Sequence, residues 1–198
     1  MSGEAWYPGG VPDAAPAGLW GTHADAGEPK FLLHTTEGGP GVYRPDPRTG
    51  VGRTYYGNAG TWPNYTLAVY GGVWRVFCHI PAGRASLSLR NTPGGVQTGR
   101  DNVSQVEIAW RAAEVSSLPG EAVAELARLL AWEHSVRGVP LVSGVRWVPY
   151  PQSYGERAGQ RLSGAEWDAY SGVLGHMHAP ENSHGDPGAF PVGALLEL

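Results

Sequence analysis

Residues 103–110 read VSQVEIAW, a run in which the side chains alternate between two faces. Gln105 and Glu107 fall on one face, whereas Val106 and Ile108 fall on the other. Because successive side chains of a β-strand point to opposite sides, this pattern predicts a strand with one half-buried face. The clearest helical pattern of the chain follows it, so this strand and helix together indicate the class of fold.

That helix is expected from Pro119 to Arg137. Apolar side chains recur along it at the three- and four-residue spacing of a buried helical face. Proline suits the first turn, and the run Gly138-Val139-Pro140 predicts the stop. A second helix is expected from Gly164 to Leu174, after a Ser-x-x-Glu capping box that begins at Ser163.

Further strands are expected from Lys30 to His34 and in a hairpin, residues 65–69 and 73–80, around Gly71-Gly72. Residues 1–29 are rich in Gly, Pro and Ala and predict an irregular N-terminal arm. The remaining residues, 30–198, are expected to form a single domain. Strands mixed with helices predict an α/β (α+β) fold with a central mixed sheet flanked by helices.

The composition excludes several classes of protein. The chain has 198 residues, a formal net charge of -4 and no basic stripe, which argues against a nucleic-acid partner. No apolar run approaches the roughly 20 residues of a membrane span, and the N-terminus lacks a secretory signal pattern. A single cysteine, Cys78, excludes an internal disulfide. We expect a monomer without stable membrane association.

Residues 175–188 read GHMHAPENSHGDPG and gather three histidines and an aspartate in a loop-like segment. Imidazole and carboxylate together form a ligand set that suits zinc. A further histidine, His34, ends the apolar run 31–33 where the sequence HTTEG opens a loop, a usual place for a site. A catalytic zinc ion needs only three protein ligands. The alternative interpretations are a polar surface loop and a locally hydrogen-bonded His34.

Three segments, HTTEG at 34–38, NVSQVEI at 102–108 and the 175–188 run, resemble the phage-type N-acetylmuramoyl-L-alanine amidases. The resemblance spans residues 30–190 in the same order and is closest to lysins of actinobacterial phages. It implies the fold of the peptidoglycan recognition proteins, which these amidases share. It also implies a Zn²⁺ ion held by His34, His176 and Asp186, with His178 in a supporting position around the ligands.

The resemblance implies three catalytic candidates. Glu107 falls where some relatives have a glutamate that acts as a base, and a strand carboxylate facing the metal can accept a proton from water. His184 falls where many relatives have a lysine that stabilises the oxyanion, a task that a histidine performs as an N–H donor. Other relatives use a tyrosine on an earlier strand, near Tyr65, although a slip of one position would bring Asn64 there.

The expected function is hydrolysis of the amide bond between N-acetylmuramic acid and L-alanine in peptidoglycan, for host lysis by a phage. The resemblance further implies that the protein resides in the host cytoplasm before its release to the cell wall. The aromatic residues Tyr56 and Trp62 are expected to line a glycan groove. Two alternatives stay open: a module that binds peptidoglycan without cleaving it, and a cysteine peptidase that pairs Cys78 with His79 or another histidine.

Overall fold

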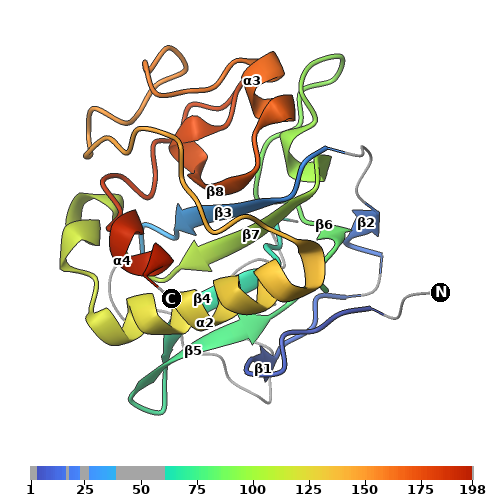
Figure 1. Cartoon of the computed structure of the whole chain (residues 1–198), viewed down its shortest axis with the longest axis vertical. Coiled ribbons are helices and arrows are strands. Elements are labelled where there is room, and N and C mark those ends of the chain that lie inside the picture. The colour runs from blue at the N-terminus through green and yellow to red at the C-terminus, as the bar shows by residue number, and fades with distance from the viewer. Residues whose placement is uncertain (1–3, 17, 23–26, 39–60, 198) are drawn as a thin grey trace.

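The centre of the molecule is a six-stranded mixed sheet (Figure 1) with strand order β1-β5-β4-β7-β3-β8. The computed structural model describes residues 4–16, 18–22, 27–38 and 61–197, so the expectation for Tyr56 lies outside the described residues. The mixed sheet with its helices confirms the α/β class. The strands of this sheet are β1 (Val11–Pro12), β3 (Lys30–Thr35), β4 (Tyr65–Tyr70), β5 (Val73–Cys78), β7 (Val103–Ile108) and β8 (Gly172–Gly175).

Strands β7, β3 and β8 are parallel neighbours, and β4 runs parallel to β7 on the other side. Every residue of β7 is buried except Glu107, which is intermediate. The prediction of one half-buried face was therefore wrong, because a central parallel strand is covered on both sides. Strands β4 and β5 form the antiparallel hairpin predicted around Gly71-Gly72, with Tyr70 paired to Val73.

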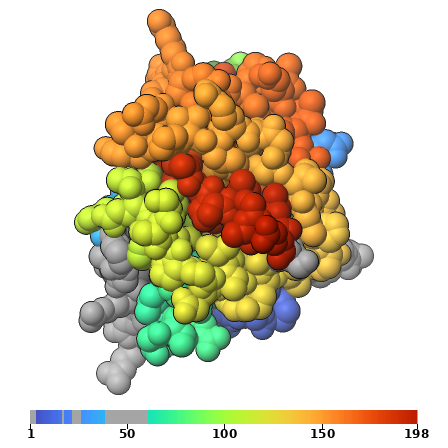
Figure 2. Space-filling model, turned by 60° about the vertical axis from the view of Figure 1, so that its left-hand side comes forward, coloured from blue at the N-terminus to red at the C-terminus, as the bar shows by residue number. Residues whose placement is uncertain are grey.

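One face of the sheet is covered by the long helix α2 (Gly120–Arg137), which packs on β4 and β5. The predicted helix is confirmed: Pro119 is its N-cap, and Gly138 ends it in the left-handed conformation at φ 72°. Helix α4 (Val192–Leu196) packs against α2. Figure 2 shows this C-terminal segment as a surface strip between α2 and the preceding segments of the chain. Helices α2 and α4 therefore cover this face of the sheet.

The second face is covered by the N-terminal arm, by irregular segments around residues 86–97 and by helix α3 (Gly164–Ala169). The arm is less irregular than expected, because β1 pairs with β5 and β2 (Gly21–Thr22) pairs with β6 (Arg84–Ala85). Three short 3-10 helices complete the described elements: η1 (Thr98–Arg100), η2 (Ala112–Ser117) and η3 (His176–His178).

The second predicted helix was too long. Helix α3 begins at the predicted capping box of Ser163 and Glu166, but it ends at Ala169. Gly172 then adopts a φ of 117°, where a Cβ would lie 2.5 Å from the carbonyl oxygen of Val142. The apolar residues that follow form β8 beside β3, so pairing with the sheet outweighs their helical spacing.

No helix in the part of the chain that the structure describes combines the length and apolar character needed to cross a bilayer.

Candidate metal centre

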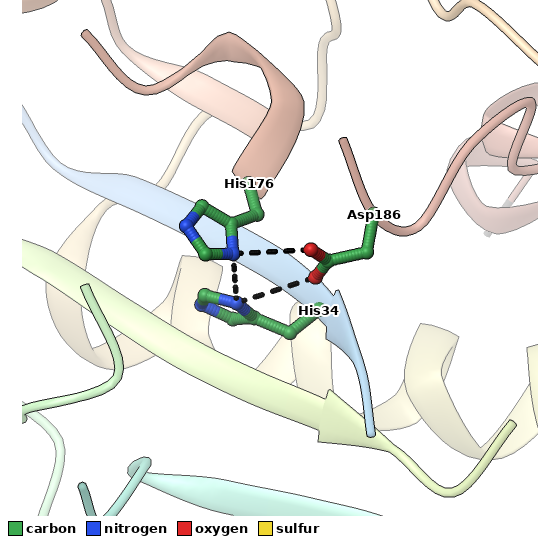
Figure 3. Close-up of side chains that lie close together, drawn as sticks. All are labelled: His34, His176 and Asp186. Atoms are coloured by element: carbon green, nitrogen blue, oxygen red, sulfur yellow. Dashed lines mark hydrogen bonds and ion pairs between the residues drawn. The ribbon is translucent and has the colours of Figure 1, made fainter. Parts of the chain in front are cut away.

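His34, His176 and Asp186 come together at one edge of the sheet (Figure 3). His34 lies near the end of β3, and His176 begins η3 directly after β8. Because β3 and β8 are parallel neighbours, with Leu33 paired to Gly175, the two histidines leave the sheet side by side. Asp186 approaches from the loop that follows η3. The structure thus brings together the three residues that the sequence predicted as ligands.

The distances between the ligand atoms match a small cation. The Nδ1 atoms of His34 and His176 lie 3.0 Å apart. Asp186 places Oδ1 3.2 Å from Nδ1 of His176 and Oδ2 3.5 Å from Nδ1 of His34. A tetrahedral zinc ion with bonds of roughly 2.0–2.1 Å sets its ligand atoms about 3.3 Å apart. All three side chains are buried in the protein.

The other nitrogen of each imidazole ring is held by a side-chain amide. Nε2 of His34 lies 3.0 Å from Oε1 of Gln105, and Nε2 of His176 lies 3.1 Å from Oδ1 of Asn182. The Nδ2 group of Asn182 donates to the carbonyl oxygen of Pro180 at 2.8 Å, which fixes the orientation of that amide. An amide oxygen only accepts, so each Nε2 carries the proton and each Nδ1 presents a lone pair to the centre.

The charge states also favour a metal. Burial lowers the pKa of His34 and keeps its imidazole neutral. Burial alone would raise the pKa of Asp186, but the neighbouring rings of His176 and His34 outweigh it and lower that pKa. Metal ligands must be deprotonated, and the neutral imidazole of His34 and the carboxylate of Asp186 satisfy that condition.

Backbone contacts hold Asp186 against the two strands. Its Oδ2 accepts a hydrogen bond of 3.1 Å from the backbone N–H of Thr35, and its carbonyl oxygen accepts one of 2.9 Å from Met177. Gly175 lets Pro187 pack closely, because a Cβ there would lie 2.7 Å from Cδ of the proline ring. The loop therefore brings Asp186 to the place where β3 and β8 position the two histidines.

Glu107 lies beside the three ligands, as its pairing with His34 across β7 and β3 requires. Its Oε1 is 3.9 Å from Nδ1 of His34. Its Oε2 is buried and has no hydrogen-bond partner among the residues that the structure describes. Burial, followed by the charges of Asp186 and Glu37, raises the pKa of Glu107 well above its usual range. A carboxylate placed this way can accept a proton at neutral pH.

His184 lies at the outer rim of the centre. Its ring stacks on that of His176, with centroids 5.1 Å apart and planes inclined by 7°. Its Nδ1 is 3.8 Å from Oδ1 of Asp186, yet 65% of its side chain is exposed. The structure therefore places His184 where its N–H can face a bound ligand.

His178 does not contact the side chains of the three ligands. Its Nδ1 accepts a hydrogen bond of 2.9 Å from the backbone N–H of Gly175, and its Nε2 lies 3.1 Å from the carbonyl oxygen of Arg146. Burial lowers its pKa to about 4, so the ring is neutral. His178 supports the turn that carries His176 and acts on the ligands only through the backbone.

Three other predicted residues lie away from the centre. Tyr65 points to the α2 face of the sheet, where its hydroxyl donates to Oε1 of Glu133 at 2.7 Å. Neighbouring residues of a strand face opposite sides, so a tyrosine at this register cannot reach His34. Trp62 is fully buried in the core and does not line a groove. Cys78 is buried on the α2 face, where burial raises the pKa of its thiol to about 12.

A groove of about 620 Å³ opens over the centre. Its floor is formed by the ligands together with Glu107, and its rim includes Arg90 and His184. This volume lies in the usual range of clefts that bind small molecules and cofactors. The remaining lining residues are Thr35, Thr36, Glu37, Thr61, Leu87, Ser88, Leu89, Asn182 and Ser183.

Neither a comparison with protein-family models nor a search of curated proteins found a match to this chain.

Sequence reasoning missed two residues that orient the ligands. Gln105 shares the face of Glu107 in the alternating run, so the strand pattern contained its position but not its contact with His34. Asn182 follows His176 by six positions in an irregular loop, where no periodicity places a side chain.

Proposed function

We propose that this chain is a zinc-dependent N-acetylmuramoyl-L-alanine amidase with the fold of the peptidoglycan recognition proteins. The observation that carries the hydrolase proposal is the convergence of two imidazole lone pairs and one carboxylate beside the buried, unpartnered Oε2 of Glu107. The bond that is cleaved, between the lactyl group of N-acetylmuramic acid and L-alanine, follows from the sequence resemblance.

The donor set fits zinc. Two imidazole nitrogens and a carboxylate oxygen are common zinc ligands, and the three side chains that carry them line the groove. When bound, zinc would act as a Lewis acid that polarises the scissile carbonyl and lowers the pKa of a water molecule to roughly 7. Gln105 and Asn182 keep both Nδ1 atoms free to act as ligands.

Glu107 is the proposed general base. Its free oxygen takes a proton from the attacking water as the new C–O bond forms. It then returns that proton to the amide nitrogen as the C–N bond breaks. The products are the lactyl carboxylic acid and the free α-amino group of L-alanine, and Glu107 returns to its initial state.

His184 is the proposed oxyanion stabiliser. Negative charge develops on the carbonyl oxygen during attack, and a preorganised N–H donor lowers the energy of that state. The stacking on His176 orients the ring, and its exposure lets it reach a substrate in the groove.

Product analysis on purified peptidoglycan tests this function. We expect new N-terminal L-alanine without new reducing sugar ends, loss of product after chelation, and recovery when zinc is restored. His176→Ala should release none. New reducing ends, or full activity of His176→Ala, would contradict the proposal. Tight binding to peptidoglycan with no product from the zinc-loaded protein would favour a recognition module instead.

A further inference from the structure

Arg161 lies behind the loop that carries two of the three metal ligands. It belongs to the irregular segment that precedes α3, and its side chain is half-buried. Nothing in the sequence marks this residue, since it has no motif and no periodic neighbours. Its contacts nevertheless converge on the residues of the metal centre.

The guanidinium of Arg161 donates to four backbone carbonyl groups. Its Nη1 donates to Ala179 at 2.9 Å and, at the longer distance of 3.4 Å, to His176. Its Nη2 donates to the carbonyl oxygen of His184 at 2.5 Å, and its Nε donates to that of Gly155 at 2.8 Å. One planar group therefore joins the start and the end of the loop to the segment behind it.

We propose that Arg161 is a positioning residue that sets the metal-binding geometry of residues 176–186. This inference rests on the metal centre proposed above. Two of the four carbonyl groups belong to His176, a ligand, and to His184, whose ring stacks on the ring of His176. By binding both carbonyl groups, Arg161 fixes the distance between the backbones of His176 and His184. It thereby sets the positions of both imidazole rings.

Only an arginine can make this set of contacts. A guanidinium presents five N–H groups in a rigid fork, whereas a lysine presents one ammonium group on a flexible stem. Other contacts hold the loop in place without Arg161. The backbone N–H of Gly155 donates to Ser183 at 2.8 Å, and that of Leu162 donates to His178 at 3.0 Å. Replacement of Arg161 should therefore leave the loop folded but less accurately placed.

Cobalt binding tests this role without depending on activity. The full chain is stripped of metal with a chelator and titrated with Co²⁺, whose visible absorption reports coordination geometry. For Arg161→Lys we expect Co²⁺ affinity about 10- to 100-fold weaker, the usual loss for residues that orient ligands, with altered visible bands. Arg157→Lys is the matched control, because Arg157 is exposed and lies four positions earlier. It should match the wild-type protein.

A second variant guards against a folding defect. Arg161→Ala should lose the same affinity and regain part of it when methylguanidinium is added. If this variant does not fold, Arg161→Lys carries the test, because it keeps the stem and the charge. Wild-type affinity and spectrum in folded Arg161→Lys would overturn the inference, as would lower thermal stability with unchanged Co²⁺ bands. Failure of the wild-type protein to bind Co²⁺ would instead overturn the metal centre itself.

Discussion

The Nδ1 atoms of His34 and His176 lie 3.0 Å apart, and each presents a lone pair to the other. This follows from the amide oxygens that hold both Nε2–H groups. Two lone pairs and a buried carboxylate at such distances repel one another in a medium of low polarity. A divalent cation between them would convert the repulsion into attraction, and the three side chains lie close enough together to hold one.

Zinc should therefore raise the thermal stability of the protein. At a free zinc concentration 100 times the dissociation constant, binding adds about 2.7 kcal/mol to the free energy of unfolding. For a chain of this size that amounts to a shift of roughly 5–10 °C in the unfolding temperature. Differential scanning fluorimetry of the chelated protein, with and without zinc, measures the shift. His176→Ala should show little change, and an equal shift in that variant would place the zinc elsewhere.

Gln105→Leu should weaken zinc binding about 10- to 100-fold, because it removes the acceptor that keeps the proton on Nε2 of His34. Without that acceptor the ring can carry its proton on Nδ1, where it blocks the metal. Competition with a chromophoric chelator gives the affinity. Gln152→Leu, at an exposed position, is the control. Equal affinities in the two variants would show that the amide does not set the tautomer.

The sequence predicted the parts of this fold that depend on local patterns. The apolar run before His34, the Gly71-Gly72 hairpin and the long helix all have local patterns that a single segment reveals. Strand β8, which contains Val173 and Leu174, was missed because Leu174 continues the helical spacing of Trp167 and Tyr170. The strand conformation of β8 comes from pairing with β3, a segment far away in the chain.

In the candidate site, too, some features could be predicted from the sequence and others depend on contacts between distant segments. The ligands belong to residue types that bind metals, and the resemblance assigned them to one centre. The positions of Tyr65 and His178 were not predictable in this way. The face of Tyr65 depends on strand register, and a shift of one residue moves a side chain to the opposite face of the sheet. The contacts of Arg161 depend on loop geometry, which has no sequence period.

Glu107→Gln should keep zinc and lose activity. The amide is nearly isosteric but cannot accept the proton, and general-base removal typically costs about 10²- to 10⁴-fold in rate. Zinc content by elemental analysis and kcat on soluble muropeptides test the two parts separately. Glu121→Gln, at an exposed position of α2, is the control. If zinc-loaded Glu107→Gln retains wild-type kcat, another group is the base.

Cys78 should have no catalytic role but should affect stability at alkaline pH. Burial raises the pKa of its thiol to about 12 in the folded protein, so folding favours the neutral form. A raised folded pKa contributes stability that is complete below the unfolded pKa, near 8.5–9, and is lost as the pH rises toward 12. The loss is up to about 1.4 kcal/mol per pH unit in that window.

Urea unfolding of the wild-type protein and of Cys78→Ala at pH 8 and pH 10 measures this effect. The wild-type protein should lose more stability between the two pH values than the variant does. Iodoacetamide should leave the activity at pH 8 unchanged. Rapid inactivation by iodoacetamide, or an inactive but folded Cys78→Ala, would instead support a thiol peptidase.

His184→Ala should lower kcat by about 10²-fold, the usual cost of removing one oxyanion donor. The side chain is largely exposed and stacks on one face of His176, so its removal should leave zinc affinity within a few-fold of wild type. His184→Lys places an N–H donor at the same position and should recover part of the lost kcat. Steady-state kinetics on zinc-loaded variants make the comparison. If His184→Ala changes KM but not kcat, the ring binds the ground state of the substrate and does not stabilise the oxyanion.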